Sequence, residues 1–122
     1  MCGSISEIPV KMEAPGIRLR EVEWGGQTVG FTEALAQMDP APLFVGLPDD
    51  RCQCPHWGYV IEGSVRFRFA DHEETYRAGD VYYAPPGHTP VVEAGARWVD
   101  FSPTDLWRKT AEVTARNIAA RG

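Results

Sequence analysis

The chain has 122 residues, of which 43% are hydrophobic and 24% are charged, a balance typical of a soluble globular domain. Its formal net charge is −5 and its longest basic run is Arg108-Lys109, so it lacks the positive surface that a nucleic-acid backbone requires. No uncharged stretch is long enough to cross a bilayer, and the N-terminus lacks the apolar region of a secretory signal. We therefore expect one cytoplasmic domain over residues 1–122 that binds neither nucleic acid nor a membrane.

A β-hairpin is expected early in the chain. Residues 17–24 partly alternate between apolar and polar side chains, Gly25 and Gly26 follow, and apolar character resumes over residues 28–31. Two glycines between such runs predict a two-residue turn, because both central residues of the favoured hairpin turns need a positive φ angle.

Short strands separated by Gly and Pro fill the middle of the chain. The clearest alternation places Val65, Phe67 and Phe69 on one face and two arginines on the other. A turn at residues 78–80 precedes the apolar run 81–84. Further short strands are expected at residues 43–47, 58–61, 91–93 and 97–101. Many short strands with frequent turns predict an all-β sandwich or barrel.

A single helix is expected at the C-terminal end, over about residues 103–120. Ser102 is predicted to cap it, with Pro103 at the first helical position and Asp105 completing a capping box. The predicted apolar side of this helix carries Leu106, Thr110 and Val113. Such an amphipathic helix packs either on the outside of the sheet or on a second subunit.

Residues 49–63, DDRCQCPHWGYVIEG, concentrate side chains that bind metals or react. On a strand, residues two apart share a face, so Cys52, Cys54 and His56 would point the same way. Asp50 would join them if the strand begins early. The opposite face would carry Trp57 and Tyr59.

Three interpretations of this run remain open. The cysteines and His56 are core residues, or Cys52 and Cys54 form a redox pair, or the group binds a metal ion. A disulfide is strained here, because residues two apart on a strand lie roughly 6.5 Å apart at Cα, at the far end of the range that disulfides tolerate. A metal site needs a fourth group, which His88 can supply.

The stretches WGYVIEGSVRFRF and YRAGDVYYAPPGHTPVV, at residues 57–69 and 76–92, resemble the two motifs of the cupin superfamily. Gly63 closes the first motif, and Gly79 opens the second, five residues before Pro85. The resemblance covers residues 43–101. It implies an all-β double-stranded β-helix, the cupin jelly-roll barrel, followed here by the C-terminal helix.

The resemblance also places the metal ligands of the family on this chain, with departures. Asp50 and Cys52 stand at the two histidine positions of the first motif, and His56 stands at its glutamate. Pro90 stands at the histidine of the second motif, with His88 two residues earlier. Because a shift of two residues along a strand keeps a side chain on the same face, His88 can still point into the barrel. The predicted ligands are Cys52, Cys54, His56 and His88.

Two thiolates and two imidazoles favour zinc among the common divalent ions, with iron as the alternative. If one coordination position stays open, the protein is expected to be a metal-dependent enzyme acting on a small carbonyl or carboxylate compound. Its candidate acid or base residues are Tyr59, Tyr83 and Glu93. If the site is closed, a binding or sensing module is expected instead, and a metal-free barrel that binds an apolar ligand is a third alternative.

We also expect a homodimer, since small barrels leave strand edges open and the family that the chain resembles commonly dimerises. The predicted contact involves Leu106, Trp107 or the N-terminal strands.

Overall fold

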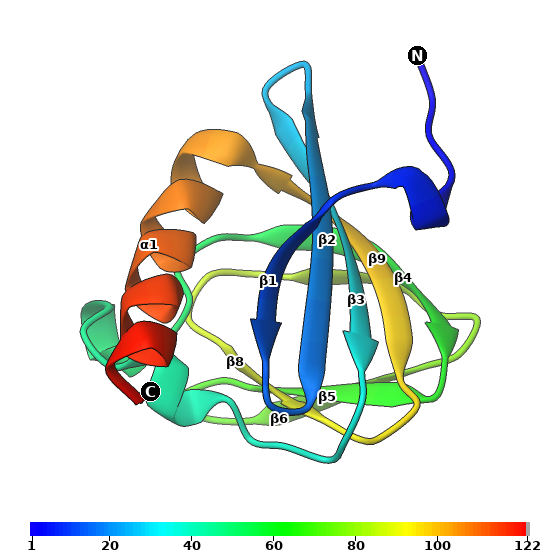
Figure 1. Ribbon diagram of the computed structural model, residues 1–122. Coiled ribbons are helices and arrows are strands. Elements are labelled where there is room, and N and C mark those ends of the chain that lie inside the picture. Colours follow the sequence, from blue (N-terminus) through cyan, green and yellow to red (C-terminus); the bar gives the residue numbers. More distant parts are fainter. Residues whose placement is uncertain (122) are drawn as a thin grey trace.

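The computed structural model describes residues 1–121 and shows two antiparallel β-sheets packed face to face, with an α-helix against one side of the barrel (Figure 1). The larger sheet has six strands in the order β1-β2-β3-β9-β4-β7, and the smaller has three in the order β6-β5-β8. The strands are Val10–Ala14 (β1), Ile17–Trp24 (β2), Gln27–Ala34 (β3), His56–Glu62 (β4), Ser64–Arg68 (β5), Glu73–Arg77 (β6), Val81–Ala84 (β7), Thr89–Val92 (β8) and Arg97–Pro103 (β9).

The helices are Thr104–Arg121 (α1) and three single-turn 3₁₀ helices, Ile5–Glu7 (η1), Ala41–Phe44 (η2) and Pro48–Asp50 (η3). The all-β barrel with one C-terminal helix, expected from the sequence, is therefore confirmed for residues 1–121. Gly122, the last residue of the predicted domain, lies outside the described residues.

The predicted hairpin is confirmed. Strands β2 and β3 pair in register from Ile17–Ala34 to Trp24–Gln27, and the turn between them has φ angles of 59° at Gly25 and 81° at Gly26. Strand β1, which pairs antiparallel with β2 at the edge of the sheet, was not predicted. Its side chains are mostly exposed and mixed in polarity, so its sequence lacks the period of two that marks a half-buried strand.

The strand predicted at residues 43–47 is wrong, because η2 includes residues 43 and 44 and residues 45–47 form a turn. Pro42 lies in the first turn of that helix, where its fixed φ suits a helix and its missing N–H is not needed. Leu43 and Phe44 are buried, and a short apolar run of this kind does not distinguish a strand from a helical turn.

The predicted helix start is also wrong by about one residue, and its capping box is absent. Strand β9 continues to Pro103, so Ser102 is a strand residue that pairs with Thr28. The Thr104 hydroxyl lies 2.9 Å from the Thr28 hydroxyl, which joins the start of α1 to β3. Ser102 is therefore free to hydrogen-bond inside the barrel rather than at the helix end.

Helix α1 packs on η2 and on β3 and β9 at one side of the barrel (Figure 1). Its buried residues are Thr104, Thr110 and Thr114. The predicted inner face is thus confirmed at Thr110 and wrong at Leu106, which is 42% exposed. A mixed threonine face has little apolar periodicity, so the sequence pattern could not orient this helix.

Buried apolar side chains form two clusters. The first, the barrel core, lies between the sheets and comprises Ala34, Val60, Val65, Phe67, Tyr76, Tyr82, Ala84, Val92, Ala96 and Trp98. The second, the helix-end cluster, lies under α1 and comprises Leu43, Phe44, Leu47, Cys52 and Cys54, with Trp107, Val113 and Ile118 packed against it. Both cysteines of the central run therefore belong to the cluster that α1 covers.

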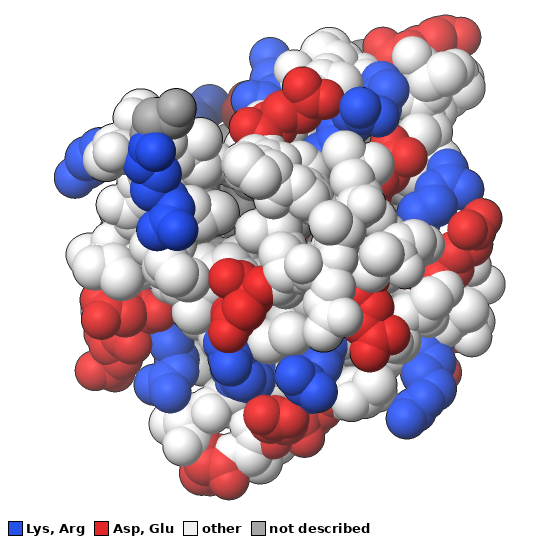
Figure 2. Space-filling model, turned by 60° about the horizontal axis from the view of Figure 1, so that its bottom comes forward, with Lys and Arg blue, Asp and Glu red and all other residues white. Residues whose placement is uncertain are grey.

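Many surface charges form ion pairs. The ion pairs include Arg18 with Glu13 at 2.8 Å, Arg68 with Asp39 at 2.7 Å and Arg97 with Glu62 at 3.0 Å. Figure 2 shows basic side chains next to acidic ones around a central area that is neither, so the described part of this face has no extended area of one charge. Within residues 1–121, no helix is long and apolar enough to span a bilayer.

Candidate metal centre

Three side chains from separate segments meet inside the barrel: Cys52 from the loop before β4, His56 at the start of β4, and His88 just before β8. Main-chain hydrogen bonds fix two of these segments together. The Cys52 N–H donates to the His88 carbonyl at 2.8 Å, and the Gly87 N–H donates to the Cys52 carbonyl at 2.8 Å. Gly87 has a φ of 96°, a conformation that favours glycine, and this turn brings His88 inward.

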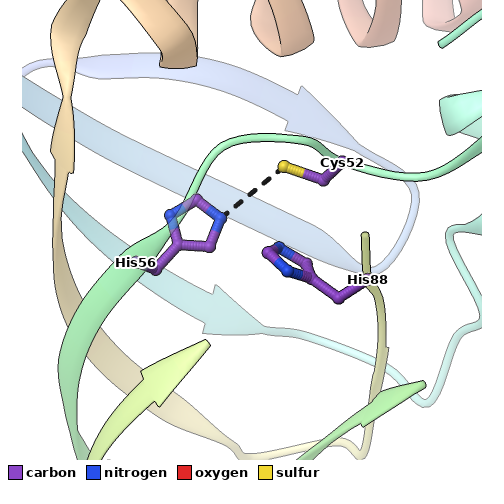
Figure 3. Close-up of side chains that lie close together, drawn as sticks. All are labelled: Cys52, His56 and His88. Atoms are coloured by element: carbon purple, nitrogen blue, oxygen red, sulfur yellow. Dashed lines mark hydrogen bonds between the residues drawn. The ribbon is translucent and has the colours of Figure 1, made fainter. Parts of the chain in front are cut away.

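The three possible ligand atoms all lie within 4.8 Å of one another. Figure 3 shows the side chains of Cys52, His56 and His88 converging on one space. The Cys52 Sγ is 3.7 Å from the His56 Nε2, and the two imidazole rings have their centroids 4.9 Å apart. His88 is 1% exposed, Cys52 1% and His56 6%. A single ion placed among these atoms would be shielded from bulk water.

The outer nitrogen of each imidazole is anchored by the surrounding chain. The His88 Nδ1 lies 2.6 Å from the Pro85 carbonyl oxygen, which only accepts, so Nδ1 carries the proton and Nε2 presents a lone pair. The His56 Nδ1 lies 2.6 Å from the Ser102 hydroxyl, which leaves its Nε2 facing the sulfur. The His88 Nε2 is buried and has no hydrogen-bond partner among the described residues.

Burial also sets the protonation states. It lowers the pKa of His56 to about 4 and, together with the charge of His56, lowers the pKa of His88 to about 3. Both imidazoles are therefore neutral at neutral pH, the form that binds metals. Burial raises the pKa of the Cys52 thiol to about 11, although a hydrogen bond with the Thr110 hydroxyl opposes this. A metal ion would be needed to hold it as a thiolate.

Cys54 is not part of this group. Its sulfur lies 3.4 Å from the Pro55 carbonyl oxygen and 4.0 Å from that of Pro103, and it packs as a core residue. The strand parity that predicted it as a ligand fails, because β4 begins only at His56 and Cys52 forms an isolated bridge with His88. Cys52 and Cys54 are both free thiols, so the structure does not contain the redox disulfide.

Asp50 also lies apart from the group. Its side chain is exposed, and its Oδ1 accepts a hydrogen bond from the Gly46 N–H at 3.0 Å. Its φ of 55° places it in a tight turn and not on a strand, so its side chain does not follow the alternation assumed for it.

The three candidate acid or base residues are not at the site either. Tyr59 and Tyr83 are 43% and 48% exposed on the outer face of the sheet, and Glu93 is exposed after β8. The predicted outward direction of Trp57 and Tyr59 is confirmed, since Trp57 is 48% exposed and its ring lies 5.1 Å from that of Tyr83. Strand alternation alone excludes Tyr59 from the face that carries His56.

Beside the three converging side chains lies a cavity of about 90 Å³. Most of its wall is apolar, including Leu19, Phe44 and Trp98. Its polar lining residues are Glu21, Thr28, Thr32, Asp100, Ser102 and Thr114, besides Cys52, His56 and His88. Sequence reasoning missed Asp100 and Ser102. The alternation of Trp98 and Asp100 in the predicted strand 97–101, continued to Ser102, is a signal that could have found them.

The fold and the site define the class: the chain is a member of the cupin superfamily, as its motifs indicated. The family model described as the AraC-like ligand binding domain matches residues 55–119, which is more than half of the chain. The protein therefore belongs to this family. A comparison with curated proteins found no match.

Solved structures agree on the fold. An RmlC-like cupin from Shewanella frigidimarina NCIMB 400 is 14% identical, with 83% of this chain and 88% of that chain covered and a TM-score of 0.59. KdgF from Halomonas sp. is 16% identical, with 82% and 92% covered and a TM-score of 0.55. An HTH_3 family transcriptional regulator from Vibrio cholerae is 10% identical, with 72% and 51% covered and a TM-score of 0.52. At these identities the likeness establishes the jelly-roll fold alone.

Proposed function

We propose that the protein binds a divalent transition metal through Cys52, His56 and His88 and uses it to act on a small carbonyl or carboxylate compound held in the adjoining cavity. The observation that supports this most directly is the His88 Nε2, a buried imidazole nitrogen with a lone pair and no partner among the described residues. An unsatisfied buried polar atom costs about 1–3 kcal/mol, so its retention calls for a ligand.

The donor set fits such an ion. One thiolate and two neutral imidazoles favour zinc, with iron as the alternative, and three protein ligands leave a tetrahedral ion one open position. When bound, the metal would polarise a carbonyl oxygen or activate a water molecule. The exclusion of Cys54 from the group therefore favours an open site over the closed four-ligand site considered from the sequence.

The remaining residues orient the ligands and limit what can enter. Ser102 and the Pro85 carbonyl fix the two imidazole rings, and such partners tune metal affinity by about 10–100-fold. The apolar wall keeps bulk water out. A cavity of about 90 Å³ is far smaller than the several hundred Å³ common for drug-sized ligands, so the ligand has only a few non-hydrogen atoms.

A second function, that of a non-catalytic binding or sensing module, draws support from the family description as a ligand binding domain and from the fold likeness to a transcriptional regulator. In this case the ligand would occupy the same cavity without turnover. Chemical change of a bound carbonyl compound supports the enzyme, whereas reversible binding of an unchanged compound supports the module.

The proposal includes a cytoplasmic homodimer. A reducing compartment keeps the Cys52 thiol free. For a dimer contact, Leu106 is available at 42% exposure, whereas Trp107 is partly buried within its own chain and donates from Nε1 to Glu21. Light scattering at micromolar concentration that shows a monomer would remove the dimer from the proposal.

Elemental analysis of protein purified without a chelator, and after loading with zinc or ferrous iron, tests the metal centre. We expect about one equivalent per chain. Cys52→Ala and His88→Gln should each lower the content at least about tenfold, because each removes a ligand.

Cys54→Ala is the matched control, since it removes an equally buried thiol that lies outside the group, and Cys2→Ala removes an exposed one. Both should keep the metal. Wild-type protein without stoichiometric metal, or equal losses in Cys52→Ala and Cys54→Ala, would refute the proposed centre.

A further inference from the structure

A row of inward-facing residues crosses the larger sheet next to the metal centre. The strand register pairs Glu21 with Gly30, Gly30 with Asp100, Asp100 with Gly58, and Gly58 with Tyr82. The row thus alternates long polar side chains with glycines across β2, β3, β9, β4 and β7. Glu21 and Asp100 both line the cavity beside the centre.

The two glycines make room for their neighbours. A Cβ at Gly30 would lie 3.1 Å from the Asp100 Oδ1, and a Cβ at Gly58 would overlap the Tyr82 ring. The Tyr82 hydroxyl, which leans over Gly58, donates a hydrogen bond to the Asp100 Oδ2 at 3.2 Å. Asp100 is therefore held in one orientation, with its Oδ1 over Gly30 and its other oxygen bound by Tyr82.

This carboxyl lies close to the three metal-binding side chains. Along β9, Asp100 and Ser102 share the inner face, and the Ser102 hydroxyl contacts His56 directly. On β4, Gly58 pairs with Asp100, and His56 is two residues away on the same face. Diagonal neighbours of this kind are about 7–8 Å apart at Cα, and His56 and Asp100 both line the cavity, so a small ligand held there would contact both.

We propose that Asp100 is the proton-transfer residue of this centre, and the proposal rests on the function proposed above. A small compound with an acidic O–H, N–H or C–H, held at the open side of Cys52, His56 and His88, gives its proton to the Asp100 carboxylate. The bonding electron pair stays on the compound, and Asp100 becomes a neutral carboxylic acid. The same proton returns to the compound or passes to water when the ligand leaves.

The protonation behaviour of the cavity agrees with this role. Burial raises the pKa of Asp100 to about 7, and hydrogen bonds from Tyr82 and Trp98 oppose the rise. Near neutral pH, both the acid and the base form are then populated, which general acid–base catalysis requires. The other carboxyl facing the cavity, Glu21, also has a raised pKa through burial, which the hydrogen bond from Trp107 opposes.

Proton release on ligand binding tests the role without requiring the natural substrate. Cobalt-loaded protein is titrated with acetohydroxamic acid, which gives up a proton when it binds a metal, by calorimetry in buffers of different ionisation enthalpy. At pH 8 the wild-type protein should release about one proton fewer than Asp100→Asn, because only the wild type has a carboxylate to capture it, and the bound hydroxamate anion beside that carboxyl raises its pKa further and keeps it protonated.

Three comparisons make the result specific. Glu21→Gln removes the other carboxyl of the cavity and should behave as the wild type. At pH 5.5 the difference between wild type and Asp100→Asn should vanish, since Asp100 then already carries a proton. Tyr82→Phe removes the donor to the carboxylate and should shift the pH at which the difference appears upward.

Equal proton release in wild type and Asp100→Asn at pH 8 would overturn the role of Asp100 while leaving the metal centre intact. If Asp100→Asn does not fold, the pH dependence of proton release is compared between the wild type and Tyr82→Phe. An unshifted profile in Tyr82→Phe then overturns the role of Asp100. Cobalt that does not bind stoichiometrically, read from the absence of a thiolate-to-cobalt absorption band, overturns the proposed function itself. Failure of acetohydroxamic acid to bind the cobalt-loaded protein overturns the open position and this role together.

Discussion

The barrel core and the helix-end cluster are buried to a similar degree, yet they are built differently. In the barrel core, side chains pack against one another, as in the stacked rings of Tyr76 and Tyr82, whose centroids are 4.6 Å apart. Where the helix-end cluster meets the barrel, Cys52, His56 and His88 turn polar atoms toward a cavity instead. The difference indicates that the first region provides stability, whereas the second contains a buried polar atom without a partner, which lowers stability there.

The largest expected effect is in the barrel core. Phe67→Ala should lower the free energy of unfolding by about 3–5 kcal/mol, because Phe67 is 3% exposed and its removal leaves a cavity between the sheets. Urea unfolding measures this value. Phe101→Ala, which removes an aromatic ring that is 46% exposed, is the control and should cost much less. Similar losses in the two variants would show that the core is not where stability resides.

Asp100→Asn tests whether burying the Asp100 carboxylate in the cavity lowers the free energy of unfolding. Since the pKa of Asp100 rises from 3.8 to about 7 on folding, the unfolded chain loses its proton first as pH rises, and the free energy of unfolding falls between about pH 4 and pH 7. This loss amounts to at most about 4 kcal/mol. Metal-free Asp100→Asn should therefore be more stable than the wild type at pH 8 and equal to it near pH 4, as measured by urea unfolding. A constant difference across this range would contradict the raised pKa.

Gly58→Ala tests the row of inward-facing residues from Glu21 to Tyr82, which runs from the cavity to the barrel core. The added methyl group overlaps the Tyr82 ring, which must move away from Asp100, and such overpacking costs about 1–3 kcal/mol. Thermal unfolding gives the stability change, and the difference in absorption spectrum between Gly58→Ala and the wild type reports the altered environment of the Tyr82 ring. Gly3→Ala, near the exposed N-terminus, is a matched control. A wild-type melting temperature in Gly58→Ala would show that the sheet adapts without moving Tyr82.

The smallest stability effect is expected at the proposed metal centre. In metal-free protein, His88→Leu removes the buried Nε2 that has no partner but also the hydrogen bond that Nδ1 donates to the Pro85 carbonyl, so the two effects offset and the free energy of unfolding should change by no more than about 1 kcal/mol. Metal binding should be lost at the same time. His72→Leu, at an exposed histidine, should leave metal content unchanged. A strong destabilisation by His88→Leu would mean that His88 is a packing residue of the barrel.

The sequence by itself determined the barrel. The two glycines at residues 25–26 specified the hairpin, and the alternation of Val65 and Phe67 with arginines specified a half-buried strand. These features are local, since turn conformation and side-chain parity depend on a few neighbouring residues. The cupin motifs then implied the double-stranded β-helix, a topology that no local pattern contains.

Which side chains converge at the candidate site was clear only from the tertiary structure. Parity predicted Cys54 with Cys52, but parity holds only within a ladder, and residues 53–55 lie in none. His88 reaches Cys52 through a turn and main-chain bonds between segments more than thirty residues apart. Asp100 enters the cavity because strand register places it between two glycines on neighbouring strands. Register and loop path are set by long-range packing, so the sequence named the three side chains that converge but could not exclude Cys54 or find Asp100.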